Sequence, residues 1–283
     1  MNILLTGSTG FIGSNLLNKL KINNKIFITV RGKKRNNLMK HKNIRIISFN
    51  NFNQLNEKLR KIRVDIIIHA ATHYNKSHSY TDLKKFSESN ILFGNIILEN
   101  IKKLNVKKFI NFSTTWEDYN GIKNNYYNLY SAYKKAFSII LNYYMINLKN
   151  VKFYELMISD TFGNNDKRPK LINVLRSNYK NSVKTKLVSK NLSINLLNVE
   201  DIVEAVLIIL NKDIYPKKYL LKNNKNFKIS EIIQRFNKIN KKKIKVTWSN
   251  NKLIKEKSLP YNQLKSWKPR KSNIMDVMNI VKK

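Results

Sequence analysis

The chain has no cysteine among its 283 residues. It therefore forms no disulfide and carries no thiolate nucleophile, which is compatible with the reducing cytoplasm. No apolar run approaches the ~18 residues that a membrane-spanning helix needs. Met1 leads directly into a short apolar segment, without the layout of a signal peptide. We therefore expect a cytoplasmic protein that has no membrane partner.

Acidic residues are also scarce. Asp and Glu number 17 against 55 Lys and Arg, which gives a formal net charge of +38. Such a charge could attract a nucleic acid. The basic residues are spread over the whole chain, however, and form no stripe, tail or aromatic-basic repeat. Because Lys, Asn and Ile are abundant throughout, we attribute the charge to overall composition. We expect no nucleic-acid partner, although the charge would favour an anionic substrate such as a nucleotide.

Glycine is rare, yet three of the 7 glycines lie in the first 13 residues, MNILLTGSTGFIG. Gly7, Gly10 and Gly13 follow an apolar segment and precede a helical pattern. In a strand–turn–helix unit, the first glycine permits a tight turn, the second lets the backbone approach a pyrophosphate, and the third lets the helix pack against the strand. Free N–H groups at the helix N-terminus would then bind the phosphates. The G-x-x-G-x-x-G spacing differs from the general G-x-G-x-x-G fingerprint, so the trio alone also fits an ordinary turn.

Short apolar segments alternate with helical patterns over the first 160 residues. The expected strands are residues 2–6, 25–30, 44–48, 65–69, 108–112 and 152–157. Strands without polar alternation are usually buried on both faces. Alternation of strand and helix at this pace predicts an α/β fold with right-handed crossovers and a doubly wound, parallel Rossmann sheet.

The pattern loosens after Gly163. Helices are expected near residues 169–179, 200–211, 230–240 and 273–281, and short strands near 186–189, 219–222 and 245–248. We therefore expect a Rossmann domain and a smaller C-terminal lobe packed onto it. The Rossmann domain would comprise residues 1–160 and parts of 192–222, and the lobe residues 161–191 and 223–283.

Several segments carry a family resemblance. TGSTGFIG resembles the opening of the extended short-chain dehydrogenase/reductase (NAD-dependent epimerase/dehydratase) family, whose members modify nucleotide-activated sugars. Similar segments run along nearly the whole chain, at VDIIIHAA (64–71), FINFSTT (109–115), YSAYK (130–134), SDTFGNND (159–166) and LLNVEDIVEAVL (196–207). The resemblance implies an NAD(P)-dependent oxidoreductase or epimerase whose C-terminal lobe binds a nucleotide sugar.

The resemblance also implies which residues contact the cofactor. They lie in the glycine turn and at the ends of two strands, namely Thr6, Gly7, Gly10, Phe11, Ile12, Gly13, Ala70, Ala71 and Ser113. The second strand should end in an acidic residue if the adenosine ribose has a free 2′-hydroxyl. It ends instead in Arg31, whose guanidinium suits a 2′-phosphate. We therefore expect NADP(H) in preference to NAD(H), with Asn51 near the adenine.

YSAYK provides a pair for proton transfer. Tyr130 and Lys134 stand four residues apart, on one face of a helix. A free tyrosine has a pKa near 10, and a neighbouring ammonium would lower that pKa towards neutral pH. The resemblance adds two roles. Lys134 would bind the nicotinamide ribose, and Thr115 would polarise the substrate oxygen with which Tyr130 exchanges a proton.

The residues after Thr115 bear on the reaction. Dehydratases of the family carry an Asp–Glu pair there, but this chain has Trp116 and Glu117. The 4-epimerases usually hold NAD through an acidic residue after the second strand, which is missing. STTWEDYNG and DTFGNNDKRPKLI (160–172) are most similar to reductases of the CDP-abequose synthase type, which reduce a nucleotide-linked 4-keto-6-deoxyhexose in deoxysugar and surface-polysaccharide biosynthesis. By this likeness the substrate would contact Tyr74, Thr115, Trp116, Glu117 and Arg168.

Two other functions stay open. A nucleotide-sugar 4-epimerase would use the same apparatus, and a non-catalytic dinucleotide sensor could share the fold, although such proteins commonly lose the tyrosine or lysine.

His69, His73 and His78 lack the supporting ligands of a zinc site, so we expect no metal. The resemblance further implies a homodimer that forms through helices near residues 91–104 and 130–148.

Overall fold

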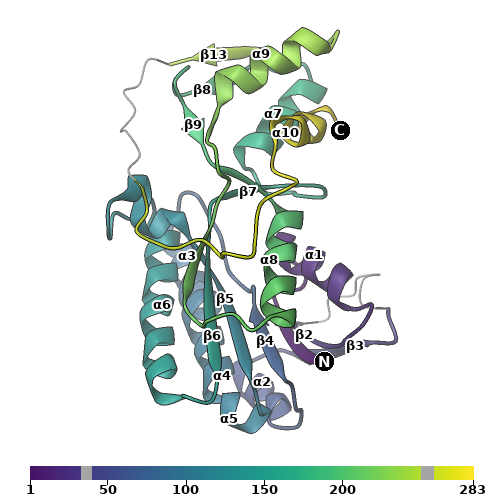
Figure 1. The fold of residues 1–283 in the computed structure, drawn as a ribbon, viewed down its shortest axis with the longest axis vertical. Coiled ribbons are helices and arrows are strands. Elements are labelled where there is room, and N and C mark those ends of the chain that lie inside the picture. Colours follow the sequence, from purple (N-terminus) through teal and green to yellow (C-terminus); the bar gives the residue numbers. More distant parts are fainter. Residues whose placement is uncertain (33–39, 250–257) are drawn as a thin grey trace.

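The computed structural model describes residues 1–32, 40–249 and 258–283. Its centre is a seven-stranded parallel sheet in the order β11-β6-β5-β4-β1-β2-β3 (Figure 1). The strands are β1 (Asn2–Thr6), β2 (Lys25–Arg31), β3 (Ile44–Phe49), β4 (Ile66–His69), β5 (Lys108–Thr114), β6 (Lys152–Ile158) and β11 (Lys218–Leu221). The continuous apolar runs in the sequence form these buried strands. The parallel sheet confirms the predicted Rossmann fold. The basic residues that follow Arg31 in the sequence, at positions 33–35, lie outside the described residues.

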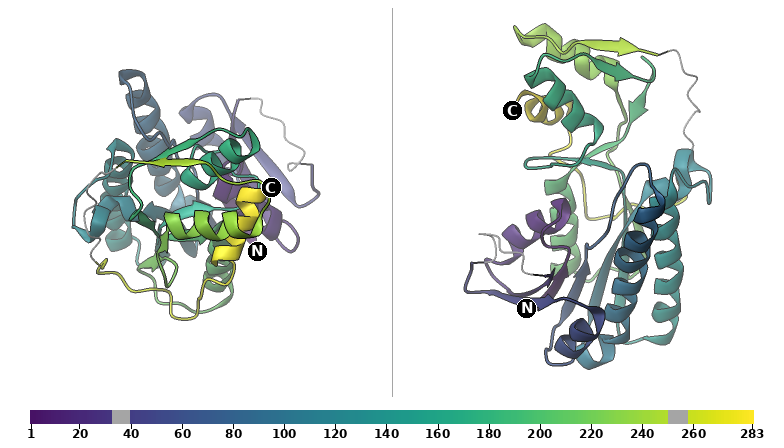
Figure 2. Two further views of the ribbon diagram at one scale, coloured as in Figure 1. Left: turned by 90° about the horizontal axis from the view of Figure 1, so that it is seen from above. Right: turned by 180° about the vertical axis from the view of Figure 1, so that it is seen from behind.

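Helices cover both faces of this sheet (Figures 1 and 2). On one face, α1 (Phe11–Leu20) and α8 (Val199–Asn211) form an apolar core with the strands. On the other face, α2 (Phe52–Leu59), α4 (Phe93–Glu99) and α6 (Leu129–Asn147) form a second apolar core, to which α5 (Ile101–Leu104) also contributes. Because each fully buried Leu, Ile or Phe side chain contributes about 1.5–3 kcal/mol, these two cores stabilise the sheet.

One helical stretch before β5 changes its type along its length. It begins as α3 (Tyr80–Phe86), behind a capping box formed by Ser79 and Asp82. It continues as a π-helix, η2 (Ser87–Leu92), and then as α4. π-helical turns are rare and frequently lie at functional sites. The apolar spacing in residues 91–104 predicts a helix there, but it does not distinguish the π-helical turn from an α-helix.

The order of the strands places a crevice at one edge of the sheet. β1 pairs with β2 on one side and with β4 on the other. The connections after β1 and β4 therefore leave towards opposite faces of the sheet. In doubly wound folds, ligands bind outside the carboxyl ends of the strands at this point of reversal.

A smaller lobe stands beyond the carboxyl ends of the strands (Figures 1 and 2). Its core lies among α7 (Leu171–Lys180), α9 (Ile229–Ile239) and α10 (Ile274–Lys282). Short ladders complete it, with β8 (Thr185–Leu187) paired to β13 (Val246–Trp248) and β9 (Ser193–Ile194) paired to β12 (Phe227–Lys228).

One more ladder, β7 (Asp160–Phe162) with β10 (Leu196–Asn198), lies between the sheet and the lobe. After β10 the chain returns to the sheet through α8 and β11. The exact division at residue 160 stays a prediction. Over residues 1–32, 40–249 and 258–283, no helix is both long enough and apolar enough to cross a membrane.

Candidate active site

A cavity of about 560 Å³ opens at the carboxyl ends of the strands. Most of the residues that we predicted from the sequence line it. They are Gly7, Gly10, Phe11, Ile12, Gly13, Arg31, Ala70, Ala71, Tyr74, Ser113, Trp116, Tyr130, Lys134 and Arg168. Thr6, Asn51, Thr115 and Glu117 do not line this cavity. The fold thus brings together side chains from the glycine turn, the ends of β2, β4 and β5, the start of α6 and the loop before α7.

The glycine turn brings β1 and α1 into close contact. Gly7 has a φ of +67°, and a Cβ there would lie 2.5 Å from the backbone nitrogen of Ala71. A Cβ on Gly13 would lie 2.0 Å from the carbonyl oxygen of Gly7. α1 begins after Gly10 without a side-chain cap, so N–H groups of its first turn are free to bind an anion. The turn therefore fits the pyrophosphate of a dinucleotide.

Thr6 supports this turn from below. Its side chain is fully buried. Its Oγ1 lies 3.0 Å from Nδ1 of His69 and accepts a hydrogen bond from the backbone N–H of Ala71, at 3.2 Å. Burial, helped by the charge of Lys134, lowers the pKa of His69 to about 3. His69 is therefore neutral at physiological pH, and Thr6 and His69 connect the ends of β1 and β4.

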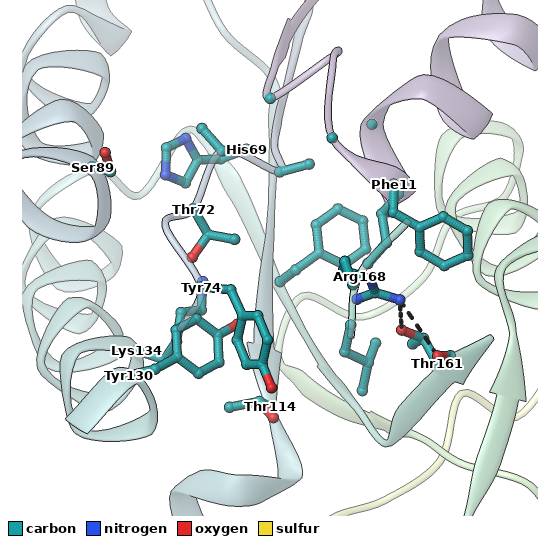
Figure 3. Close-up of a pocket in the computed structure, with 18 of the residues that line it drawn as sticks. Phe11, His69, Thr72, Tyr74, Ser89, Thr114, Tyr130, Lys134, Thr161 and Arg168 are labelled. Carbon is teal, nitrogen blue, oxygen red and sulfur yellow. Dashed lines mark hydrogen bonds between the residues drawn. The ribbon is translucent and has the colours of Figure 1, made fainter. Parts of the chain in front are cut away.

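Tyr130 and Lys134 lie at the start of α6. The side chain of Asn128 caps this helix by accepting a hydrogen bond from the backbone N–H of Ser131, at 3.1 Å. The Tyr130 ring meets the Tyr74 ring edge-on, with centroids 5.1 Å apart. Figure 3 shows these two rings next to each other above Thr114, with Arg168 across the cavity.

The expectation of an acidified phenol is wrong for the protein without ligands. Burial raises the pKa of Tyr130 to about 12, and Glu117 adds to this, whereas Thr72 and Arg168 act in the opposite direction. Burial also lowers the pKa of Lys134, against the influence of Glu117 and Glu155. The desolvation of each charged form outweighs the attraction that we expected between phenolate and ammonium. The Tyr130 phenol is therefore protonated at pH 7.

Thr115 lies at a second cavity of about 460 Å³. Seven residues line both cavities, so the two adjoin: Tyr74, Trp116, Ser159, Asp160, Thr161, Pro169 and Lys170. Thr114, the residue before, lines the first cavity and is the hydroxyl that lies below Tyr130 in Figure 3. The proposed role of Thr115 stays a prediction, and Thr114 is a second candidate for it.

Glu117, which we expected at the substrate, is instead fully buried below the site. Its Oε2 lies 3.0 Å from Nζ of Lys218, and Nζ of Lys218 lies 3.5 Å from Oε1 of Glu155. Glu117 belongs to η3 (Thr115–Gly121), a short 3₁₀ segment whose capping box turns its carboxylate back to the backbone N–H of Thr114, at 3.4 Å. This local turn explains why Glu117 lines neither of the two cavities.

A row of polar residues crosses the sheet beneath the site. The strand register aligns one residue from each of five neighbouring strands, Thr6, His69, Asn111, Glu155 and Lys218. Residues in register on parallel strands point to the same face. Here that face lies below α6, whose Ser138 donates a hydrogen bond to Glu155. The row therefore lies under Lys134.

Arg168 reaches the glycine turn from the loop before α7. Its guanidinium makes two hydrogen bonds of 2.8 Å to the carboxylate of Asp166 and one of 2.7 Å to Oγ1 of Thr161. Its Cζ lies 4.4 Å from the centre of the Phe11 ring, at the start of α1. We expected Arg168 at the phosphates of the substrate, whereas its place beside the glycine turn also suits the phosphates of a dinucleotide.

Asn51 and Arg31 both have protein partners. Oδ1 of Asn51 accepts a hydrogen bond from the backbone N–H of Gln54, at 3.0 Å, and so caps α2. The expected contact of Asn51 with adenine stays a prediction, which would have to use the rest of this side chain. Nη1 of Arg31 donates to Oε2 of Glu88 at 3.0 Å. The sequence shows no acid after β2, but the fold brings one there from η2.

Lys170 is a site residue that we did not predict. Its Nζ lies 3.9 Å from the centre of the Trp116 ring and 3.0 Å from Oδ1 of Asp160. Lys170 and Asp160 line both cavities. The run DKRPK (166–170) could have indicated Lys170 as well as Arg168, but in so basic a chain a single lysine carries little signal.

Comparisons with known proteins identify the family. A model of the NAD dependent epimerase/dehydratase family matches residues 3–221. A CDP-abequose synthase of Yersinia pseudotuberculosis is 28% identical over 224 residues, covering 75% of this chain and 74% of that protein. A dTDP-D-glucose 4,6-dehydratase of Dictyostelium discoideum is 32% identical over 250 residues, covering 74% of this chain and 55% of that protein.

Solved structures support the fold. UDP-glucuronic acid 4-epimerase from Bacillus cereus, in complex with UDP-glucuronic acid and NAD, matches 100% of this chain and 99% of its own with a TM-score of 0.79 at 16% identity. At that identity the likeness concerns the fold alone. The family model, in contrast, spans the glycine turn, Tyr130, Lys134 and the whole central sheet. The chain is therefore an enzyme that belongs to the NAD dependent epimerase/dehydratase family.

Proposed function

We propose that the protein is an NADPH-dependent reductase of a nucleotide-linked 4-keto-6-deoxy sugar, acting in the cytoplasm in deoxysugar and surface-polysaccharide biosynthesis. The observation that carries the proposal is the place of Tyr130, which lines one cavity together with Lys134 and the glycine turn. The likeness of 75% of this chain to a CDP-abequose synthase supports the substrate class.

The residues present fit a reduction. When bound, NADPH supplies the hydride for the carbonyl carbon. Tyr130 would donate its phenolic proton to the carbonyl oxygen, so that ketone, hydride and proton together give an alcohol. Thr114 or Thr115 would orient that oxygen. Lys134, at the foot of the cavity, would hold the nicotinamide ribose and align the reactants.

The residues present do not fit a dehydration. Loss of water from the sugar needs an acid and a base that reach the substrate. Trp116 stands where dehydratases of the family carry the aspartate, and Glu117 is buried and ion-paired with Lys218. Neither side chain could transfer a proton to or from the substrate in this geometry. The proposed reaction therefore differs from that of the dehydratase with which the chain shares 32% identity.

A 4-epimerase is the second candidate. The Glu88 carboxylate beside Arg31 is the observation that favours it, because an acidic group near the end of the second strand suits a ribose 2′-hydroxyl and hence NAD. An epimerase would oxidise and then reduce the same carbon, with no net use of cofactor.

One assay separates these candidates. Purified protein is mixed with NADPH and a CDP-linked or dTDP-linked 4-keto-6-deoxyhexose, and the loss of NADPH absorbance is followed. We expect consumption of one NADPH per sugar reduced, and consumption that is slower by about 10²-fold or more with the Tyr130→Phe variant. The proposal is wrong if NADPH is stable with every keto sugar while the protein interconverts the 4-hydroxyl epimers of a nucleotide sugar.

The proposal includes a homodimer formed through α6. Three large apolar side chains, Ile139, Tyr143 and Ile146, are 61%, 63% and 72% exposed on this helix. Their spacing of four and three residues places them on one face. We expect Ile139→Asp combined with Ile146→Asp to convert a dimer into a monomer in light scattering. The exposed Ile22 provides the control, because Ile22→Asp should leave the dimer intact. A wild-type monomer at micromolar concentration would contradict this prediction.

A further inference from the structure

An ion pair lies at the end of β2, beside the cavity. Arg31, the last residue of β2, lines the cavity. Its Nη1 lies 3.0 Å from Oε2 of Glu88, and the two side chains are 46% and 29% exposed. In a doubly wound fold, the end of the second strand faces the 2′ position of the adenosine ribose. The pair thus lies where NAD(H) and NADP(H) differ.

The fold holds both partners of this pair in place. Cζ of Arg31 lies 5.0 Å from the centre of the Phe52 ring and 5.9 Å from that of the Phe49 ring. Such stacking keeps the guanidinium plane against an apolar surface. The Phe93 ring, at the start of α4, stacks on Phe49 with centroids 5.9 Å apart. α4 continues directly from η2, so this contact ties the helix that carries Glu88 to the strand beside Arg31.

The π-helical turn η2 is anchored on both sides of Glu88. Before it, the hydroxyl of Ser87 lies 3.0 Å from that of Tyr133 on α6. After it, Asn90 is buried and bonded to the backbone of His73, accepting from N–H at 2.7 Å and donating to C=O at 3.0 Å. With both neighbours fixed, the Glu88 carboxylate is directed at β2. Nζ of Lys84 also approaches it, at 4.0 Å.

The two partners of this ion pair would favour different cofactors. A guanidinium binds a 2′-phosphate through paired hydrogen bonds. A carboxylate repels that phosphate and instead accepts a hydrogen bond from a free 2′-hydroxyl. Because Glu88 already occupies Nη1 of Arg31, a 2′-phosphate has to share or displace this partner.

We propose that Glu88 is a specificity-determining residue, which competes with the 2′-phosphate of NADP(H) for Arg31 and so limits the preference of the protein for NADP(H) over NAD(H). This inference rests on the proposed function only in that it takes a nicotinamide dinucleotide as the ligand. It corrects the sequence-based argument, in which no acid was available at the end of β2.

The test measures dissociation constants of NADPH and NADH by the change in their fluorescence on binding. We expect Glu88→Gln to tighten NADPH binding about tenfold, the order of effect of releasing one charge-assisted pair, and to leave NADH unchanged or weaker. Arg31→Gln should remove the preference for NADPH. In the Arg31→Gln background, Glu88→Gln should give a much smaller gain, since there is no guanidinium to release.

Control variants separate this mechanism from general charge effects. Glu231→Gln removes the same charge from an exposed position on α9, in the smaller lobe, and should change neither constant. Glu88→Asp keeps the charge but withdraws it by one methylene, and should fall between wild type and Glu88→Gln. If either Glu88 variant fails to fold, the other still gives the ratio of the two constants.

The outcomes distinguish the two proposals. If wild-type protein binds neither NADPH nor NADH, the proposed function fails. If it binds them but Glu88→Gln shifts both constants equally, or shifts neither, the inference about Glu88 is overturned and the proposed function stands. A full tenfold gain that persists without Arg31 would also overturn the competition mechanism.

Discussion

Replacement of Tyr130 by phenylalanine should lower turnover by about 10²–10⁴-fold, the usual contribution of a positioned general acid. The ring stays in contact with Tyr74, and only the proton donor is lost. Dissociation constants of the dinucleotide should change little. Steady-state rates with the keto sugar, together with dinucleotide titrations, check both parts of the prediction.

Tyr215→Phe is the control. Tyr215 is exposed and lines neither cavity, so turnover should be unchanged. Turnover of Tyr130→Phe within about threefold of wild type would show that another group supplies the proton.

The pKa of Tyr130 adds a pH dependence to this prediction. Burial raises this pKa to about 12, and a general acid is active while it is protonated. Tyr130 by itself should therefore cause no loss of the reduction rate between about pH 6 and pH 9. A reduction rate that falls through about pH 8 in wild type would indicate either another titrating group or a phenol acidified by the bound cofactor.

Acidification from about pH 6.5 to pH 3 should destabilise the protein by about 5 kcal/mol through His69 alone. The pKa of this buried imidazole is about 3 in the folded protein, against 6.5 for the unperturbed group. The unfolded chain therefore binds a proton over this range that the folded protein does not, and stability is complete above pH 6.5 and declines as the pH falls. Each pH unit costs about 1.4 kcal/mol.

Urea unfolding at several pH values between about 4 and 7 measures how steeply the free energy of unfolding changes with pH. His69→Asn keeps an acceptor for Thr6 but has no titrating group, so its stability should fall less steeply with acid than that of wild type. Replacement of the exposed His78 by asparagine should leave the slope unaltered. Parallel slopes for wild type and His69→Asn would contradict the prediction.

Features that depend on local chemistry, or on the spacing of residues along one helix or strand, could be predicted from the amino-acid sequence. Gly7 and Gly13 could be identified because a Cβ cannot fit where strand and helix meet. Tyr130 and Lys134 could be paired because a helix places residues four apart on one face. The buried strands could be located because their apolar runs are continuous.

Contacts between distant segments were decided by the tertiary structure. Glu88 lies 57 residues from Arg31 in the chain, and only the π-helical turn and its anchors direct the carboxylate to β2. Glu117 pairs in the core with Lys218, which lies 101 residues away in the chain. The pKa of Tyr130 depends on how much water its surroundings exclude. Burial and pairing of charges arise from packing in three dimensions, and neither residue spacing nor composition contains that information.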